Sequence, residues 1–205
     1  MIRNLIFDFG KVLVDYDFQQ LITQFFSETE KEAEKEFLDI ITSDEFLDQC
    51  DLGEMNLEEL VNHYTERYPK FSREFRMFND RYIEFVLGEM PGMRELLTRL
   101  KKMGYRLYGL TNWCSVVHEV MRRYGIFDLL DGRVVSSEEK LIKPDPAIYR
   151  CLCERYSLKP EECLFTDDKE KNVAGAKSIG MEAVVFTDAE TYRKDLARIT
   201  GNAEI

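Results

Sequence analysis

The sequence predicts an α/β fold in which a parallel sheet has helices on both faces. Three observations carry this prediction. Short apolar runs typical of strands recur along the chain, and amphipathic segments typical of helices separate the later runs. One long segment near the N-terminus interrupts this alternation with helical patterns alone. Because regular alternation of strand and helix favours parallel pairing, the interruption indicates a helical insertion into an α/β core.

The elements of the predicted core follow from these patterns. Apolar runs predict strands at Ile2–Phe7, Arg106–Leu110, Gly132–Ser136, Cys163–Thr166 and Ala183–Thr187. Helical spacing predicts helices at Gly92–Met103, Ser115–Tyr124, Pro144–Tyr156 and Glu170–Ile179. The first of these helices has Pro91 at its start and Gly104 just past its end, which is the usual asymmetry of helix termini.

The segment from Phe18 to Phe85 contains no convincing strand. It is rich in Glu, Lys, Phe, Leu and Tyr at helical spacing, and we expect an all-helical insertion after the first strand. Its acidic run Glu28–Glu36 is typical of a solvated helix face.

Composition and charge exclude several classes of function. The chain has 205 residues and a formal net charge of -11, which argues against a nucleic-acid partner. Its N-terminal residues lack a signal-peptide pattern, and no apolar stretch reaches membrane-spanning length, so we expect a cytoplasmic protein without a membrane partner. The five cysteines are irregularly spaced, and we expect buried, reduced thiols. The oligomeric state is left open between a monomer and a weak dimer.

Polar side chains follow four of the predicted elements. Asp8 comes directly after the first strand, Thr111-Asn112 follows the second, Lys143 precedes a proline-led helix, and Asp167-Asp168 follows the fourth strand. Since the carboxyl ends of parallel strands share one edge, these groups should converge there. Converging carboxylates suit Mg²⁺, while a Lys and a Thr/Asn pair suit the oxygens of a phosphoryl group. An Asp nucleophile beside Mg²⁺ is an established route to an aspartyl-phosphate.

At these residues the chain resembles the haloacid dehalogenase superfamily, and the resemblance covers nearly all of it. Four motifs in the right order carry it: Ile6–Gly10, Leu110–Asn112, Lys143–Tyr149, and Phe165–Asp168 with Asn172 and Gly180-Met181. The resemblance implies a discontinuous Rossmann-like core at residues 1–15 and 88–205 with a helical cap at residues 16–87. Phe46–Met55 also resembles a cap element of a branch that includes bacterial α-glucose-1-phosphate phosphatases.

The resemblance implies a role for each matching residue. Asp8 attacks phosphorus, and Asp8, the backbone carbonyl of Gly10 and the carboxylate of Asp168 bind Mg²⁺. Thr111 and Asn112 bind phosphoryl oxygens, and Lys143 neutralises charge on the nucleophile and the phosphate. Asp167 supports the metal site, with a helix N-cap as its alternative, and Asn172 takes a supporting position behind it. For Asn112, a turn role and a phosphate role are left even.

Gly10 is the departure from the family pattern. Most phosphatases of the superfamily have an Asp at this position as general acid and then base, and glycine keeps only the metal contact. General acid–base help contributes ~10²–10⁴-fold, so we expect substrates with good leaving groups, such as sugar 1-phosphates. The substitute acid is Asp15, Asp17, a cap residue or water, with Asp15 nearest in sequence.

We therefore expect a Mg²⁺-dependent phosphatase that acts on a small phosphorylated metabolite. Three alternatives stay open. A metal-free carbon–halogen hydrolase is disfavoured by the paired Asp167-Asp168, and a phosphomutase is disfavoured by Gly10, which removes the usual acid/base. A catalytically weak protein that binds a phosphorylated ligand is kept open by the same glycine.

Other conspicuous residues have plainer interpretations. Lys11 is expected in solvent, and Trp113 and Cys114 are expected to pack. His63 and His118 are expected to be surface or core residues and not ligands. The aromatic spacing of Phe71, Phe75, Phe78 and Tyr82 is typical of a helical core first and of a substrate-facing cap surface second.

Overall fold

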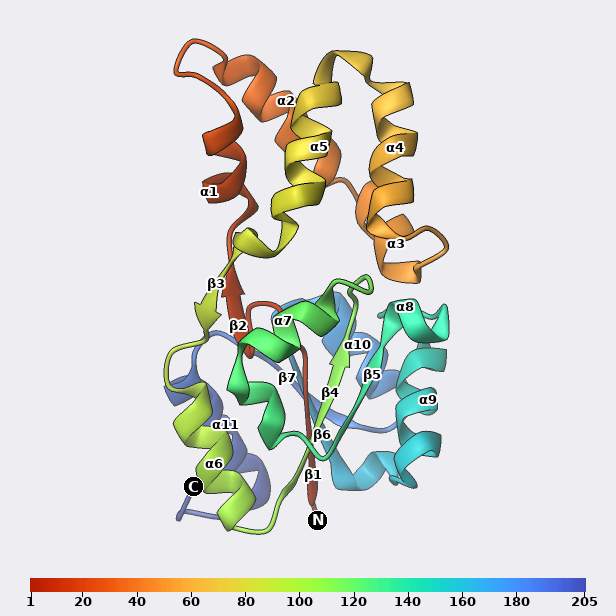
Figure 1. Cartoon of the computed structure of the whole chain (residues 1–205). Helices are drawn as coiled ribbons and strands as arrows, with labels where there is room; N and C mark the ends of the chain where they lie inside the picture. Colours follow the sequence, from red (N-terminus) through yellow and green to blue (C-terminus); the bar gives the residue numbers. More distant parts are fainter.

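A five-stranded parallel sheet forms the centre of the molecule (Figure 1). The structure is a computed structural model and describes residues 1–205. The strands are β1 (Asn4–Phe7), β4 (Arg106–Thr111), β5 (Gly132–Val135), β6 (Cys163–Asp167) and β7 (Glu182–Val185), in the order β5-β4-β1-β6-β7. Each predicted strand is present within one or two residues at each end, and the predicted fold class is confirmed.

Helices cover both faces of the sheet because the side chains of its strands alternate between two apolar clusters. Leu5 and Phe7 of β1 lie in one cluster, whereas Ile6 lies in the other. The first cluster includes residues of α6 (Met93–Lys102), α7 (Val117–Arg123) and α11 (Ala189–Thr200), and the second includes residues of α9 (Pro146–Tyr156) and α10 (Glu170–Ser178). The short α8 (Ser136–Glu139) and the C-terminal α11 were not predicted.

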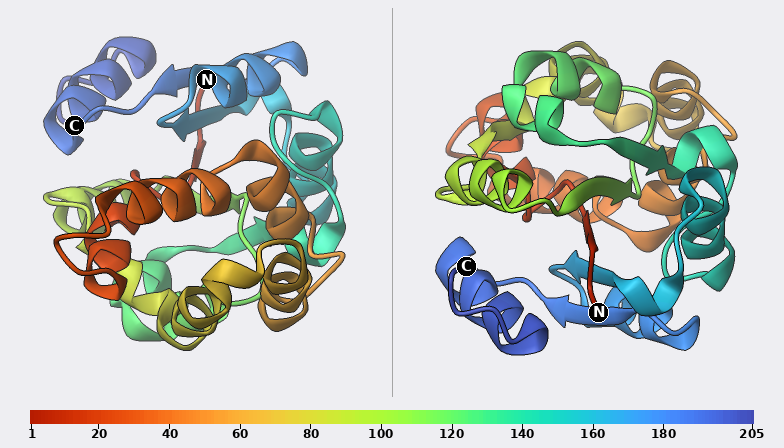
Figure 2. Two further views of the ribbon diagram at one scale, coloured as in Figure 1. Left: turned by 90° about the horizontal axis from the view of Figure 1, so that it is seen from above. Right: turned by 90° about the horizontal axis from the view of Figure 1, so that it is seen from below.

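The predicted helical insertion is present and contains no strand between Phe18 and Phe85. It consists of α1 (Phe18–Ile22), α2 (Lys31–Ile41), α3 (Asp44–Leu52), α4 (Leu57–Arg67) and α5 (Ser72–Arg81), with short 3₁₀ turns after α1, α4 and α5. Phe71, Phe75 and Phe78 are buried, and the ring centroids of Phe37 and Phe75 lie 4.9 Å apart, so the aromatic spacing reflects a core. The view from above in Figure 2 shows this segment (red to yellow) over one end of the core, with α11 (blue) to one side.

A two-stranded antiparallel ribbon joins the helical segment to the core, and sequence patterns missed it. It pairs β2 (Val14–Tyr16) with β3 (Val86–Glu89), and its register shifts between Asp15 and Tyr16. Strands of three and four residues are too short for a periodic signal, and their partners lie far apart in the chain. The boundaries expected for the insertion, residues 16 and 87, fall inside this ribbon.

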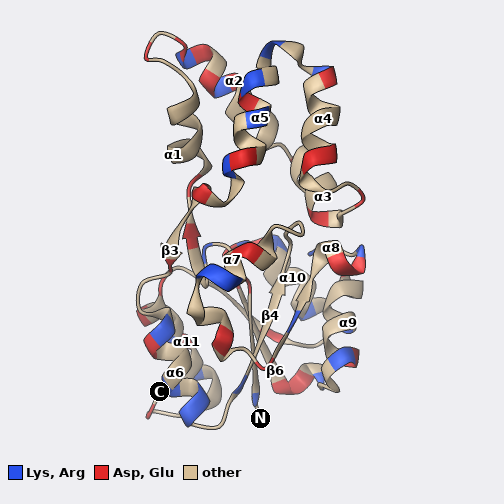
Figure 3. Ribbon diagram, in the orientation of Figure 1, with Lys and Arg blue, Asp and Glu red and all other residues tan.

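Charged residues, helices and cysteines can now be placed in the fold. Asp and Glu are interspersed with Lys and Arg along the helices of the core and of the insertion (Figure 3). None of the helices has the length and apolar character that crossing a membrane requires. The cysteines are free, and all but Cys151 are buried. The acidic run is not solvated throughout, because Glu34 is buried and accepts hydrogen bonds from Gln19 and Thr23.

Candidate active site

The strand order brings the predicted site residues to one edge of the sheet. Central β1 pairs with β4 on one side and β6 on the other, so the chain leaves β1 at a switch point of the topology. Asp8 directly follows β1, and its backbone N–H donates to the carbonyl of Thr166 at 2.9 Å. Thr111 ends β4 and Asp167 ends β6. The three side chains therefore meet where three adjacent strands stop.

A buried lysine joins two of the carboxylates. Lys143 Nζ lies 2.9 Å from Asp8 Oδ1 and 2.6 Å from Asp167 Oδ2, and it donates to the carbonyl of Leu110 at 3.1 Å. Burial favours neutral lysine, but Asp167 and Asp8 outweigh it and raise the pKa of Lys143. The ammonium therefore stays charged between two acids, with its three donors occupied.

Asp167 is a fully buried acceptor whose oxygens are already engaged. In addition to Lys143, it accepts two hydrogen bonds from the Asn172 amide, at 2.9 and 3.1 Å, and one from the Lys169 backbone N–H at 2.9 Å. Burial acts to raise the pKa of Asp167, but Lys143 and these donors outweigh burial, so the pKa lies below its ordinary value. A carboxylate has about four acceptor sites, so Asp167 is better suited to hold Lys143 than to ligate a cation directly.

Asp8 and Asp168 keep oxygens free for a cation. Ligand oxygens of Asp8, Asp167 and Asp168 all lie within 4.8 Å of one another. Burial raises the pKa of Asp8 to about 7, with Lys143 opposing and Asp167 reinforcing the increase, and burial likewise raises the pKa of Asp168. Gly10 lines the same pocket, and its carbonyl accepts no backbone hydrogen bond. This oxygen-only set fits Mg²⁺, which would relieve the repulsion among the carboxylates.

Replacement of Asp8 tests this electrostatic arrangement. The native carboxyl binds its proton more tightly than the unfolded one, since its pKa rises from 3.8 to about 7. The free energy of unfolding therefore falls as the pH rises from 3.8 to about 7. In metal-free buffer at pH 8, Asp8→Asn should raise the free energy of unfolding by ~1.4 kcal/mol or more, the equivalent of one pKa unit, and the gain should vanish near pH 4.

Urea unfolding at both pH values measures this difference. Asp39→Asn is the matched control, because Asp39 is exposed on α2 and makes no ion pair. A loss of stability at pH 8 in Asp8→Asn would contradict the arrangement, because it would mean that the ion pair with Lys143 outweighs the burial of Asp8.

Thr111 and Asn112 line the pocket in different ways. The Thr111 hydroxyl makes no hydrogen bond within the chain and is free to meet a ligand. The Asn112 amide is occupied: it accepts from the Lys143 backbone N–H at 2.7 Å and donates to the Lys143 carbonyl at 3.0 Å. Asn112 therefore holds the backbone that presents Lys143, and its predicted contact with phosphoryl oxygens stays a prediction.

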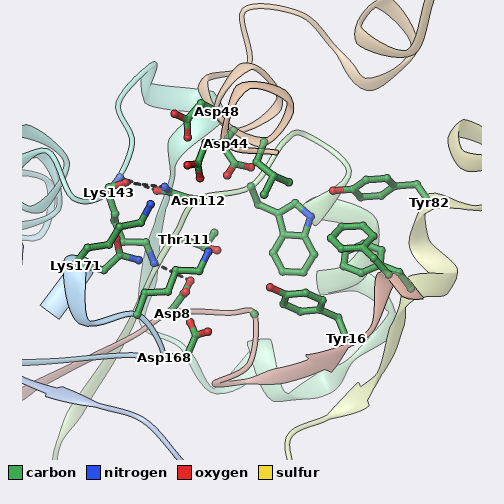
Figure 4. Close-up of a pocket in the computed structure, with 18 residues that line it drawn as sticks. Asp8, Tyr16, Asp44, Asp48, Tyr82, Thr111, Asn112, Lys143, Asp168 and Lys171 are labelled. Atoms are coloured by element: carbon green, nitrogen blue, oxygen red, sulfur yellow. Dashed lines mark hydrogen bonds and ion pairs between the residues drawn. The ribbon is translucent and has the colours of Figure 1, made fainter. Parts of the chain in front are cut away.

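The ring of Tyr16 occupies the space beside Gly10. A Cβ at Gly10 would lie 2.8 Å from Tyr16 Cε1, closer than unstrained atoms approach. Figure 4 shows the Tyr16 hydroxyl pointing toward the side of the pocket that holds Asp8 and Thr111. The missing side chain at position 10 is thus matched by a phenol from β2, which explains why glycine fits there.

A double-mutant cycle tests this packing. Gly10→Ala should destabilise the protein by ~1–3 kcal/mol, as overpacking of a filled core does. The penalty should shrink in a Tyr16→Val background, because valine does not reach the position of the Tyr16 ring. Urea unfolding of the four proteins measures the coupling, and equal penalties in both backgrounds would contradict the contact.

The remaining walls of the pocket come largely from residues that sequence patterns did not single out. Asp44, Asp48 and Asp51 of α3 line it opposite the sheet, and Lys169 and Lys171 line it from the start of α10. Figure 4 shows Asp44 and Asp48 on the α3 side, facing Asp8 and Asp168. Phe18, Tyr82, Phe85 and Trp113 add an aromatic wall. The spacing of the three α3 acids on one helix face was a signal in the sequence.

The candidate acids nearest to Gly10 in sequence lie outside the pocket lining. Asp15 pairs with Lys11 at 2.6 Å, and Asp17 caps α1 by accepting from the Gln20 backbone N–H. Lys11 is thus partly exposed and paired.

Neither histidine is among the residues that line the pocket. Trp113 is buried, as expected of a packing residue, but it also faces the pocket, and its indole N–H has no partner.

Comparison with known proteins identifies the family. A family model for haloacid dehalogenase-like hydrolases matches residues 2–180. The chain belongs to this family. A glyceraldehyde 3-phosphate phosphatase of Pyrococcus furiosus is 32% identical over 112 residues, which cover 54% of this chain and 47% of the relative. The chain thus spans about half the length of the curated relatives it matches.

Solved structures of haloacid dehalogenase-like proteins share the fold. A predicted hydrolase of Porphyromonas gingivalis superposes with a TM-score of 0.78 at 22% identity, covering 98% of each chain. An enzyme of the family from Bacteroides thetaiotaomicron, in complex with magnesium and inorganic phosphate, gives a TM-score of 0.73 at 21% identity over 92% of this chain and 96% of its own. The predicted family is therefore confirmed.

Proposed function

We propose that this haloacid dehalogenase-like hydrolase is a Mg²⁺-dependent phosphatase that acts on a small phosphorylated metabolite through an aspartyl-phosphate. One observation carries the proposal: Lys143 holds Asp8 at the edge of the sheet while Asp8 and Asp168 keep oxygens free for a cation. Curated relatives that are phosphatases, and a structural neighbour bound to magnesium and phosphate, support it.

Each core residue has a chemical task in the proposed reaction. The Asp8 carboxylate attacks phosphorus, and the bond from phosphorus to the leaving oxygen breaks. The Thr111 hydroxyl binds a non-bridging oxygen, and the nearby Lys143 ammonium neutralises negative charge on the nucleophile and the phosphoryl group. Asp167 keeps Lys143 charged and in place. Bound Mg²⁺, held by Asp8, Asp168 and the Gly10 carbonyl, supplies further charge neutralisation.

We propose that residues 16–87 act as a cap over this site. The helices of this segment lie at the carboxyl edge of the sheet (Figure 1), and α3 contributes side chains to the pocket that holds Asp8. A cap that closes over the substrate excludes bulk water and strengthens the electrostatic interactions inside.

The lining of the pocket favours a polyhydroxylated substrate such as a sugar phosphate. The carboxylates of Asp44 and Asp48 can accept hydrogen bonds from hydroxyl groups, and the rings of Phe18, Tyr82 and Trp113 offer apolar faces to a sugar ring. A sugar 1-phosphate is the specific form proposed, because its anomeric oxygen leaves more easily than a simple alkoxide.

Replacement of the nucleophile tests the proposed function. Asp8→Asn should lower the turnover of p-nitrophenyl phosphate in Mg²⁺ on the order of 10³-fold or more, as loss of a covalent nucleophile does. EDTA should abolish wild-type turnover, and Asp39→Asn should keep it. Undiminished turnover in Asp8→Asn would contradict the role of Asp8 as nucleophile, and EDTA-resistant turnover would contradict the Mg²⁺ dependence.

A substrate screen tests the specificity. Sugar phosphates should give a higher kcat/KM than phosphomonoesters of the same charge that lack hydroxyl groups, because only the former can hydrogen-bond to Asp44 and Asp48. Steady-state phosphate release with Mg²⁺ measures this difference. Equal kcat/KM values for sugar phosphates and simple alkyl phosphates would contradict the assigned role of the α3 carboxylates.

A further inference from the structure

Gly10 leaves the proposed phosphatase without the usual proton donor, and the pocket contains another one. We propose that the carboxyl group of Asp51 protonates the leaving oxygen and then accepts a proton from the water that hydrolyses the aspartyl-phosphate. This inference rests on the proposed function, and it assigns the catalytic acid/base to the helical insertion.

The position of Asp51 in the pocket is the first support. It lies in the last turn of α3, on the helix face that also presents Asp44 and Asp48, and all three line the same pocket as Asp8. Asp44 and Asp48 are exposed, whereas Asp51 is partly buried. The inner carboxyl of the α3 face is therefore the one shielded from bulk water, as a proton donor inside a closed site must be.

The backbone of Asp51 is fixed relative to the core. Ser136 Oγ donates to the Asp51 carbonyl at 2.6 Å and accepts from the Trp113 backbone N–H at 3.0 Å. One hydroxyl thus ties α3 to the loop that follows Thr111 and Asn112. A proton donor needs such a fixed position with respect to the phosphoryl group it serves.

Gly53 lets α3 approach the core this closely. It ends the helix in the left-handed region, with a φ of 63°, and a Cβ there would lie 2.6 Å from the Cβ of Ser137. Lys140 also donates to the Gly53 carbonyl. The end of α3 that carries Asp51 is thus held by hydrogen bonds from Ser136 and Lys140 and packs closely against Ser137.

The surroundings of Asp51 keep its proton available near neutral pH. Burial raises its pKa to about 8, Cys114 and Asp8 add to the increase, and Lys169 and Lys143 oppose it. Tyr16 and Tyr82 also face it from β2 and from the 3₁₀ turn after α5. A group with this pKa is protonated in part and ionised in part near neutral pH, so it can serve as acid in one step and base in the next.

Asp51 can serve both the formation and the hydrolysis of the aspartyl-phosphate, because it donates one proton in the first step and accepts one in the second. In the first, Asp8 bonds to phosphorus, the leaving oxygen takes its electron pair, and Asp51 transfers its proton to that oxygen. In the second, water attacks phosphorus, Asp51 accepts a proton from the water, and the bond from phosphorus to Asp8 breaks. Inorganic phosphate leaves, and Asp51 is protonated again for the next cycle.

Other groups near Gly10 are less suited to this role. Asp15 and Asp17 are engaged outside the pocket lining. The Tyr16 hydroxyl faces the pocket, but burial, reinforced by Asp168 and Asp8, raises its pKa above the ordinary value of a phenol. It can donate a hydrogen bond, whereas full proton transfer to a leaving oxygen is harder from so weak an acid.

Leaving-group dependence in Asp51→Asn tests the proposal. A p-nitrophenolate ion leaves without protonation, whereas a primary alkoxide requires it. Asp51→Asn should lower kcat/KM for a primary-alcohol phosphate by ~10²–10⁴-fold and leave kcat/KM for p-nitrophenyl phosphate nearly unchanged. In the wild type, kcat/KM for the alcohol phosphate should fall as pH rises through about 8, because Asp51 loses its proton, and Asp51→Asn should lack this decrease.

Matched variants separate this role from a structural one. Asp39→Asn removes one carboxylate charge from the helical insertion outside the pocket, and Tyr16→Phe removes the phenol; neither should change the ratio of the two kcat/KM values. Thermal unfolding followed by circular dichroism should show that Asp51→Asn is folded, since the Asp51 side chain makes no hydrogen bond within the chain. Equal losses on both substrates, or a selective loss in Tyr16→Phe instead, would overturn the proposal. Failure of the wild type on both substrates would overturn the proposed function itself.

Discussion

The placement of one buried ammonium group, that of Lys143, constrains the whole site. Asp8, Asp167 and Asp168 converge because three adjacent strands end together, and their repulsion would be costly without a cation. Lys143 bridges two of them, and its backbone is held in turn by the Asn112 amide. In the proposed reaction, this arrangement positions Asp8 for attack and leaves free carboxylate oxygens of Asp8 and Asp168 for a metal ion.

In the proposed account, Gly10 explains why the proton donor belongs to the helical insertion and not to the core. Glycine at position 10 has no side chain that could transfer a proton, and the Tyr16 ring fills the space beside it. The proposed nucleophile, metal ligands and phosphate contacts lie on the sheet edge, and the carboxylates of α3 line the pocket opposite them. In the proposed account, proton transfer therefore depends on how α3 docks against Ser136, and catalysis requires the insertion to be in place.

Sequence patterns predicted the core well because its signals are local. Each core strand is an apolar run, and Asp8, Thr111 and Asp168 could be placed at one edge because parallel strands end together. The ribbon of β2 and β3 was missed because it is short and pairs residues about seventy positions apart.

The roles of individual side chains were harder to predict, because they depend on contacts between distant segments. The occupied oxygens of Asp167 and the paired amide of Asn112 are visible only once their partners are placed. Asp51 belongs to a segment whose sequence resembled a cap element, but nothing in its spacing indicated which acid of α3 would lie deepest. Sequence proximity was misleading for Asp15, which pairs with Lys11 instead of facing the pocket.

The central claim is that Asp8, held by Lys143, forms a covalent bond to phosphorus. Rapid acid quenching during turnover of p-nitrophenyl phosphate with Mg²⁺, followed by peptide mass spectrometry, tests this claim most directly. The account predicts a phosphoryl mass on the peptide that contains Asp8, and its absence when Asp8 is replaced by Asn. A phosphoryl group on another residue, or turnover without any phosphorylated peptide, would contradict it.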